Sequence, residues 1–129
     1  EVKSYLEVLA EKGMTPVSKK EDAVVVHDSC VYARHEGVVD EPRQLLERAG
    51  VTIKNPRECK KLTFCCGGPA ESLFPSKAFA VGAKRMKQLS KEGNKVAVMC
   101  PICYANLKHA ANKDVQLVDM ADYLGECYL

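Results

Sequence analysis

The sequence predicts an α/β fold in which helices cover both faces of an open, mostly parallel sheet of 4–5 strands. Short runs of apolar and β-branched residues recur along the chain, as expected for buried strands. Longer segments with apolar residues at helical spacing lie between them. Parallel strands need a crossover connection, usually a helix, and this alternation provides one each time.

The N-terminal part of the chain is expected to form two helices and two strands. Residues 2–12 predict a helix, because apolar side chains repeat at helical spacing there: Val2, Tyr5, Leu6, Leu9 and Ala10. Residues 23–26 are continuously apolar, which is typical of a strand buried on both faces. Asp40 is expected to cap a helix that runs to Ala49, with Pro42 in its first turn and Gly50 after its end. Residues 51–53 predict a brief second strand.

The C-terminal part continues the alternation. Residues 62–64 predict a short third strand, and residues 76–92 predict the longest helix, with Phe79, Ala83, Met86 and Leu89 on its core face. Its lysines are expected to form a solvated face or, alternatively, to dock an acidic electron-transfer partner: Lys77, Lys84, Lys87 and Lys91. The remaining expected elements are a strand at 95–99, a helix at 101–111, a strand at 115–118 and a helix at 119–124. The whole arrangement is Rossmann-like.

Length and composition fit a single domain over residues 1–129. The net charge is +2 and tryptophan is absent, so nothing indicates a nucleic-acid partner. No apolar run approaches the length of a membrane span, and no signal peptide opens the chain. Because the first residue is Glu1, we expect a fragment of a longer protein. Localisation is expected to be cytoplasmic, or peripheral at the inner membrane through partners.

Seven cysteines are the most informative feature of the composition. An odd number without a secretory signal fits a disulfide framework poorly and favours metal binding or redox chemistry. Five of them follow predicted strands: Cys30, Cys65, Cys66, Cys100 and Cys103. Loops at the carboxyl ends of parallel strands form the binding crevice of such sheets, so these five thiols are expected to converge.

The residues around these cysteines suit metal ligation. Cys100 lies at a predicted helix N-terminus, where free N–H groups favour the thiolate that binds iron or zinc. Gly67 and Gly68 follow Cys65 and Cys66, and glycine lets the main chain approach a cluster closely. Five thiolates exceed the four that a zinc site or a cubane cluster needs. The surplus favours an unusual cluster, or it leaves one thiol free for substrate.

The chain resembles the cysteine-rich CCG domain in three motifs at characteristic intervals. The motifs are His27-Asp28-Ser29-Cys30, Cys65-Cys66-Gly67 and Cys100-Pro101-Ile102-Cys103, with 34 residues between Cys30 and Cys65 and 33 between Cys66 and Cys100. This domain occurs in the B subunit of heterodisulfide reductases and in the iron–sulfur subunits of glycolate, lactate and glycerol-3-phosphate oxidoreductases. The chain departs from the family at Ser29, where proline is usual, and at Val31, where histidine is usual. It also carries only one of the two motifs that family proteins commonly have.

This resemblance implies a function and a cofactor. All five cysteines would ligate a [4Fe–4S] cluster, cubane or non-cubane, in a redox domain that transfers electrons or reduces a disulfide. The chain would be part of an oxidoreductase, with other subunits or domains of an electron-transfer complex as partners. A small-molecule disulfide or a hydroxy-acid pathway would supply its substrate. A domain handled in air is expected to lose the cluster, with Cys100 and Cys103 then pairing as a disulfide.

Two other functions stay open on the sequence. One is a structural zinc-binding module, and the other is a metal-free thiol–disulfide oxidoreductase that uses Cys100 and Cys103. Several further residues have two interpretations. Cys59 and Cys127 are incidental thiols or auxiliary ligands, and His27 is a strand-end residue or a neighbour of the site that orients Cys30. His35 and His109 are expected to face solvent.

Overall fold

A computed structural model describes all residues, 1–129, and contains one parallel sheet. Its strands are β1 (Ala23–His27), β2 (Thr52–Lys54), β3 (Lys95–Val98) and β4 (Gln116–Asp119), in the order β2-β1-β3-β4. Every neighbouring pair is parallel, with Val24 opposite Ile53, Val26 opposite Ala97 and Ala97 opposite Val118. The predicted fold class is therefore confirmed, with four strands.

The strand order places a topological switch point at the centre of the sheet. The chain leaves β1 for β2 on one side, and later returns to the other side of β1 through β3. Connections from β1 and β3 therefore run in opposite directions beyond the carboxyl ends of these two strands. Ligands of open α/β sheets bind at such switch points.

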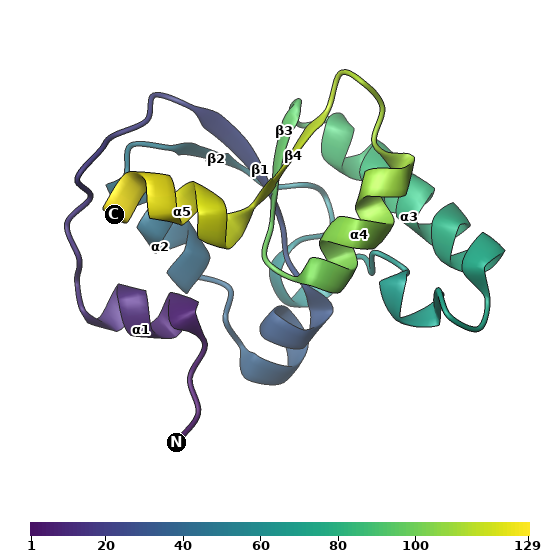
Figure 1. The fold of residues 1–129 in the computed structure, drawn as a ribbon, viewed down its shortest axis with the longest axis horizontal. Coiled ribbons are helices and arrows are strands. Elements are labelled where there is room, and N and C mark those ends of the chain that lie inside the picture. The colour runs from purple at the N-terminus through teal and green to yellow at the C-terminus, as the bar shows by residue number, and fades with distance from the viewer.

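Helices cover both faces of the sheet (Figure 1). On one side lie α1 (Tyr5–Glu11), α2 (Glu41–Arg48) and α5 (Met120–Tyr128). On the other lie α3 (Pro75–Ser90) and α4 (Pro101–Ala110). Side chains of β1 alternate between two cores, since Val24 and Val26 face the first group of helices and Val25 faces the second. This period of two is the geometry of a pleated strand.

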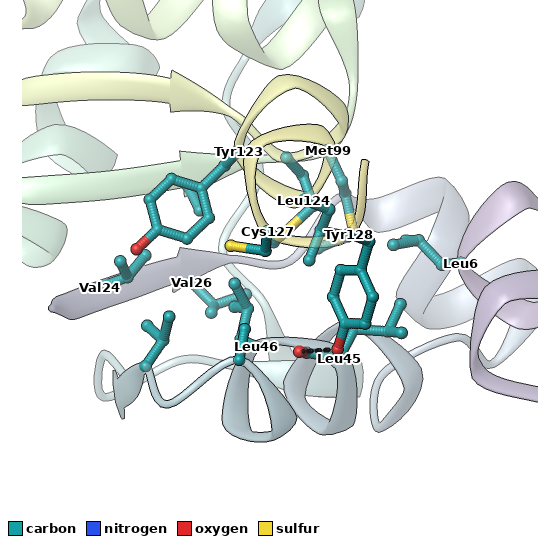
Figure 2. Packing of buried hydrophobic residues seen from close by; sticks show 14 of the residues in the cluster. Leu6, Val24, Val26, Leu45, Leu46, Met99, Tyr123, Leu124, Cys127 and Tyr128 are labelled. Atoms are coloured by element: carbon teal, nitrogen blue, oxygen red, sulfur yellow. Dashed lines mark hydrogen bonds between the residues drawn. The ribbon is translucent and has the colours of Figure 1, made fainter. Parts of the chain in front are cut away.

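The larger core forms between the sheet and helices α1, α2 and α5 (Figure 2). Figure 2 shows Leu46 of α2 beside Val26 and Leu45 of α2 below Tyr128 of α5, with Leu124 of α5 above Leu46. The Tyr128 hydroxyl donates a 2.6 Å hydrogen bond to the Leu45 carbonyl, which satisfies the one polar atom that this ring buries. The smaller core packs Met86, Leu89 and Leu107 on the opposite face.

Short helical turns connect the larger elements near the switch point. They are the π-helical turn η1 (Val31–Glu36) and the 3₁₀ turns η2 (Lys60–Leu62) and η3 (Gly68–Ala70). The strand predicted at residues 62–64 is wrong, because η2 and a loop occupy this region and Leu62 is exposed. Three apolar residues are too few to distinguish a strand from a turn.

Three helix predictions need correction. The first helix begins after Ser4, which makes a capping box with Glu7, so Val2 lies outside it and is exposed. Asp40 precedes α2, but its carboxylate bonds the Lys60 ammonium and not a helix N–H. In α3 the buried face holds Ala78, Gly82, Arg85, Met86 and Leu89, whereas Phe79 and Ala83 are exposed. The predicted core face therefore included Phe79 in place of Arg85, because apolar periodicity alone does not assign an arginine to a core.

Candidate metal centre

The candidate site lies beyond the carboxyl ends of β1 and β3, at the switch point. Cys30 precedes η1, just after β1, and Cys100 is the N-cap residue of α4, just after β3. Cys103 lies in the first turn of α4 and is buried. Cys65 and Cys66 come from the loop between η2 and η3. Elements far apart in the sequence thus meet where parallel-sheet geometry predicts.

The turn after Cys65 and Cys66 requires glycine twice. Gly67 has φ +83°, and a Cβ there would lie 2.6 Å from the Ala78 carbonyl oxygen. A Cβ on Gly68 would lie 2.5 Å from Cγ2 of Ile102. Real Cβ atoms do not approach other atoms so closely, so neither position accepts a side chain without movement of its neighbours. The tight turn brings the loop directly against α3 and α4.

The same turn directs backbone N–H groups at sulfur. The Gly67 amide donates to Cys65 Sγ and the Gly68 amide donates to Cys66 Sγ, each at 3.3 Å. Asn106 of α4 holds the turn in place, because its side-chain amide donates to the Cys66 carbonyl at 2.5 Å and to the Ala78 carbonyl at 3.1 Å. N–H groups aimed at sulfur stabilise thiolate charge, so the turn is preorganised for anionic sulfur.

Three buried ligand atoms come together at the centre of the site. Those of His27, Cys66 and Cys103 all lie within 4.8 Å of one another. The pKa of Cys66 is lowered to about 4, because the Cys103 thiol donates to its sulfur and the His27 ring and Gly68 amide add to this against the effect of burial. The pKa of Cys103 is raised by the same hydrogen bond and by burial. Cys66 is therefore the thiolate of the pair.

The other three cysteines adjoin this centre and are partly exposed. Burial raises the pKa of Cys65, the Gly67 amide opposes this, and the neighbouring thiols Cys66 and Cys30 raise it further. The charge of Cys100 contributes to the raised pKa of Cys103. Each of the five cysteines is thus an electrostatic neighbour of at least one other, and that all five bind one group stays a prediction.

A buried ion pair anchors the loop that carries Cys30. Asp28, next to His27, accepts two hydrogen bonds from the Arg43 guanidinium of α2, each 2.8 Å long. The backbone amide of Lys60 donates to the same carboxylate at 2.6 Å, and the Thr63 hydroxyl donates to the Asp28 carbonyl at 2.7 Å. These contacts fix the end of β1 relative to η2, and so position Cys30 relative to the loop of Cys65.

Three polar residues of the site were missed by the sequence analysis: Arg43, Arg85 and Asn106, all buried. Arg85 donates from Nε to Nδ1 of His27 at 3.1 Å. A signal for Arg85 was present, because it lies at helical spacing between Ala78 and Gly82 on one side and Leu89 on the other. A charged residue inside an apolar stripe of a helix indicates a buried polar contact.

Most cysteines, histidines and lysines outside the three cysteine motifs lie away from the site. Cys127 is buried in the larger core, outside the site, and Cys59 is partly exposed before η2. His35 and His109 are exposed, as predicted. The lysines of α3 are exposed as well. His27, by contrast, is buried at the site, and burial lowers the pKa of its ring.

The residues present fit an iron–sulfur group. Nε2 of His27 and Oγ of Ser29 are both buried without a partner in hydrogen-bond geometry, and both flank the end of β1 at the site. Buried donors of this kind need an acceptor, and sulfur of a cluster or of a thiolate provides one. Five thiols and two amide donors complete a donor set that suits iron.

Comparisons with known proteins agree with this chemistry. A dihydromethanophenazine:CoB–CoM heterodisulfide reductase subunit from Methanosarcina barkeri is 30% identical over 118 residues, which cover 86% of this chain and 28% of that protein. A fumarate reductase (CoM/CoB) subunit from Methanothermobacter marburgensis is 30% identical over 123 residues, covering 89% of this chain and 24% of that protein. An EtfAB:quinone oxidoreductase from Syntrophomonas wolfei is 38% identical over 71 residues, which cover 52% of this chain and 10% of that protein.

The chain thus spans less than a third of the length of these relatives. No solved structure matches the chain. No helix of the structure is both long enough and apolar enough to cross a bilayer. The family model of the cysteine-rich domain matches residues 24–108, and the chain therefore belongs to the CCG cysteine-rich domain family.

Proposed function

We propose that this chain is the iron–sulfur-binding domain of a heterodisulfide reductase-like oxidoreductase. Cys30, Cys65, Cys66, Cys100 and Cys103 would hold a [4Fe–4S] cluster of cubane or non-cubane form. The observation that supports this proposal is the group of Cys66, Cys103 and His27, whose ligand atoms lie within 4.8 Å of one another, with backbone amides directed at Cys65 and Cys66. When bound, such a cluster accepts and donates electrons at a potential that its surroundings tune.

The residues of the chain contribute binding, charge and access. Cys66 is held as a thiolate, so it requires no deprotonation before it binds iron. Gly67 and Gly68 supply N–H donors that lower the charge density on sulfur. The buried pair Asp28–Arg43 keeps the two ligand loops at a fixed separation. Because these groups are already in place, the loops that carry the cysteines would move little when the charge of the site changes.

Exposure indicates where an electron or disulfide partner would approach. Cys66 and Cys103 are buried, whereas Cys30, Cys65 and Cys100 are partly exposed. Val31, next to Cys30, and Ile102, next to Cys103, are each about half exposed, at 52% and 53%. These two apolar side chains lie next to site cysteines, on the surface that a partner would meet. We infer that a second subunit or domain of an electron-transfer complex docks over this edge of the sheet and brings the substrate disulfide or the next redox centre.

A second candidate function rests on the buried group of His27, Cys66 and Cys103. Two thiols and an imidazole within 4.8 Å are a ligand set that structural zinc sites use. Zinc binding would leave Cys65 and Cys30 without a role. It would also require a free lone pair on His27.

Anaerobic reconstitution of the purified chain with iron and sulfide tests the proposal. We expect a broad visible absorption of thiolate-to-iron charge transfer and a paramagnetic signal in one of the two redox states. The matched control is Cys127→Ala, which removes a buried thiol of the larger core, because it should retain both signals. Stoichiometric zinc after purification, with no visible absorption after reconstitution, would instead support the structural zinc module.

A further inference from the structure

Arg85 is a fully buried guanidinium with no carboxylate at ion-pair distance. It is 0% exposed, and none of the ion pairs of the structure includes it. The Asp28 carboxylate, which contributes most among the negative charges that act on Arg85, is already bonded to Arg43. An unpaired buried cation is costly, so its position requires a reason.

The hydrogen bonds of Arg85 show how the guanidinium is held. Nη1 donates to the Glu58 carbonyl and to Gln88 Oε1, both at 2.9 Å, and Nη2 donates to Thr63 Oγ1 at 3.3 Å. Gln88 is fixed in turn, because its amide donates to the Glu58 carboxylate at 2.6 Å. These contacts leave Nε directed at Nδ1 of His27, at 3.1 Å.

The chemistry of the two side chains then fixes the proton on His27. Arginine has donors only, so Nδ1 must accept with its lone pair. A ring whose Nδ1 accepts a hydrogen bond is not the doubly protonated imidazolium, so it is the imidazole form with one lone pair and one N–H. The proton must therefore be on Nε2, the buried ring nitrogen that has no partner of its own. Cys66 and Cys103 are the thiols within 4.8 Å of the ring.

We propose that Arg85 is a positioning residue that fixes His27 as a hydrogen-bond donor to the Cys66 sulfur and prevents it from ligating a metal. The inference deepens the proposed function, on which its redox consequence rests. An N–H donated to ligand sulfur stabilises the more negative, reduced state, so the potential of the site is higher with His27 than without it. The same proton excludes the zinc set of His27, Cys66 and Cys103, because Arg85 occupies the only lone pair that the ring can offer.

The tautomer of His27 can be measured in the unmodified chain without any metal. Long-range ¹⁵N–¹H correlation spectra of ¹⁵N-labelled reduced protein report which ring nitrogen carries the proton. His35→Gln and His109→Gln remove the other two imidazoles from exposed positions and assign the signals. We expect protonated Nε2 and an unprotonated Nδ1. Protonated Nδ1, or a rapidly exchanging mixture of tautomers, would overturn the proposal.

Two substitutions of His27 separate a donor from a ligand in the cluster-loaded chain. His27→Gln retains a side-chain N–H, and His27→Phe removes it. If His27 is a donor, both variants keep the wild-type iron content, the potential falls in His27→Phe, and His27→Gln recovers part of the loss. Equal loss of iron in both variants would identify a ligand and overturn the proposal.

Arg85→Gln should lower the potential as well, with Lys87→Gln on the exposed face of α3 as the matched control. The tautomer measurement keeps the inference testable should Arg85→Gln fail to fold. It is also independent of iron. A chain that binds no cluster would contradict the proposed function, while the tautomer would still decide the role of Arg85.

Discussion

Arg43→Met should destabilise the domain strongly, because it leaves the Asp28 carboxylate buried without its cation. The Asp28 side chain is 0% exposed and that of Arg43 is 8% exposed, so water cannot replace the lost partner. Arg43 also donates to Asn55 and to the Val39 carbonyl, and these acceptors lose their donor too. Removal of one partner from a buried ion pair typically costs about 3–5 kcal/mol, a large part of the roughly 5–15 kcal/mol that stabilises a domain.

Urea unfolding of the metal-free chain, followed by circular dichroism, measures this loss as a lower midpoint at unchanged slope. Arg48→Met is the matched control on the same helix, because Arg48 is exposed and makes only a 3.4 Å contact with the Ala10 carbonyl, so we expect a change within about 0.5 kcal/mol. The double variant Asp28→Asn/Arg43→Met should recover part of the stability, because it removes the unpaired charge. Equal losses in Arg43→Met and Arg48→Met, or strictly additive losses at Asp28 and Arg43, would refute the reasoning.

Two further predictions concern backbone geometry and pH. Gly67→Ala should lower the free energy of unfolding in urea by about 2–4 kcal/mol, since it combines a left-handed φ with a 2.6 Å approach to the Ala78 carbonyl. Gly125→Ala is the control, because a Cβ there meets no atom within 4 Å, and it should be neutral or stabilise α5. A small loss for Gly67→Ala would show that the turn can relax. The pKa of Asp22 is lowered from 3.8, chiefly by its hydrogen bond from Lys95, so its contribution to stability is present above that value and is lost as the pH falls through the lower folded-state pKa. The stability difference between wild type and Asp22→Asn should therefore shrink as the pH is lowered through this range, and a difference independent of pH would contradict the assignment.

Much of the fold could be predicted from the sequence, because parallel strands and their crossover helices carry strong local patterns. The β-branched run at 23–26 and the run at 95–99 became the two central strands, with small changes at their ends. The positions of Cys30 and Cys100 at strand ends followed from the same patterns. A group of thiols at one edge of the sheet was predictable because carboxyl ends of parallel strands meet there.

The polar frame around the thiols could not be predicted in the same way. The ion pair of Asp28 with Arg43 and the contact of Arg85 with His27 join residues 15 and 58 positions apart, and no local pattern specifies such partners. The thiolate at Cys66 could not be predicted either. The pKa of Cys66 is lowered by Cys103 and His27, which come from other elements, so no local pattern indicates it. The preference for thiolate at Cys100 stays a prediction.

Iron and acid-labile sulfide per chain, measured after anaerobic reconstitution, test the central claim most directly. Each of the five cysteines would be replaced by serine in turn, with Cys59→Ser and Cys127→Ala as controls outside the site. The account predicts about four irons and four sulfides per wild-type chain and per control chain, and a marked loss in the site variants, most severe at the buried thiolate Cys66. Wild-type levels of iron in Cys66→Ser, or an equal loss in Cys127→Ala, would contradict it.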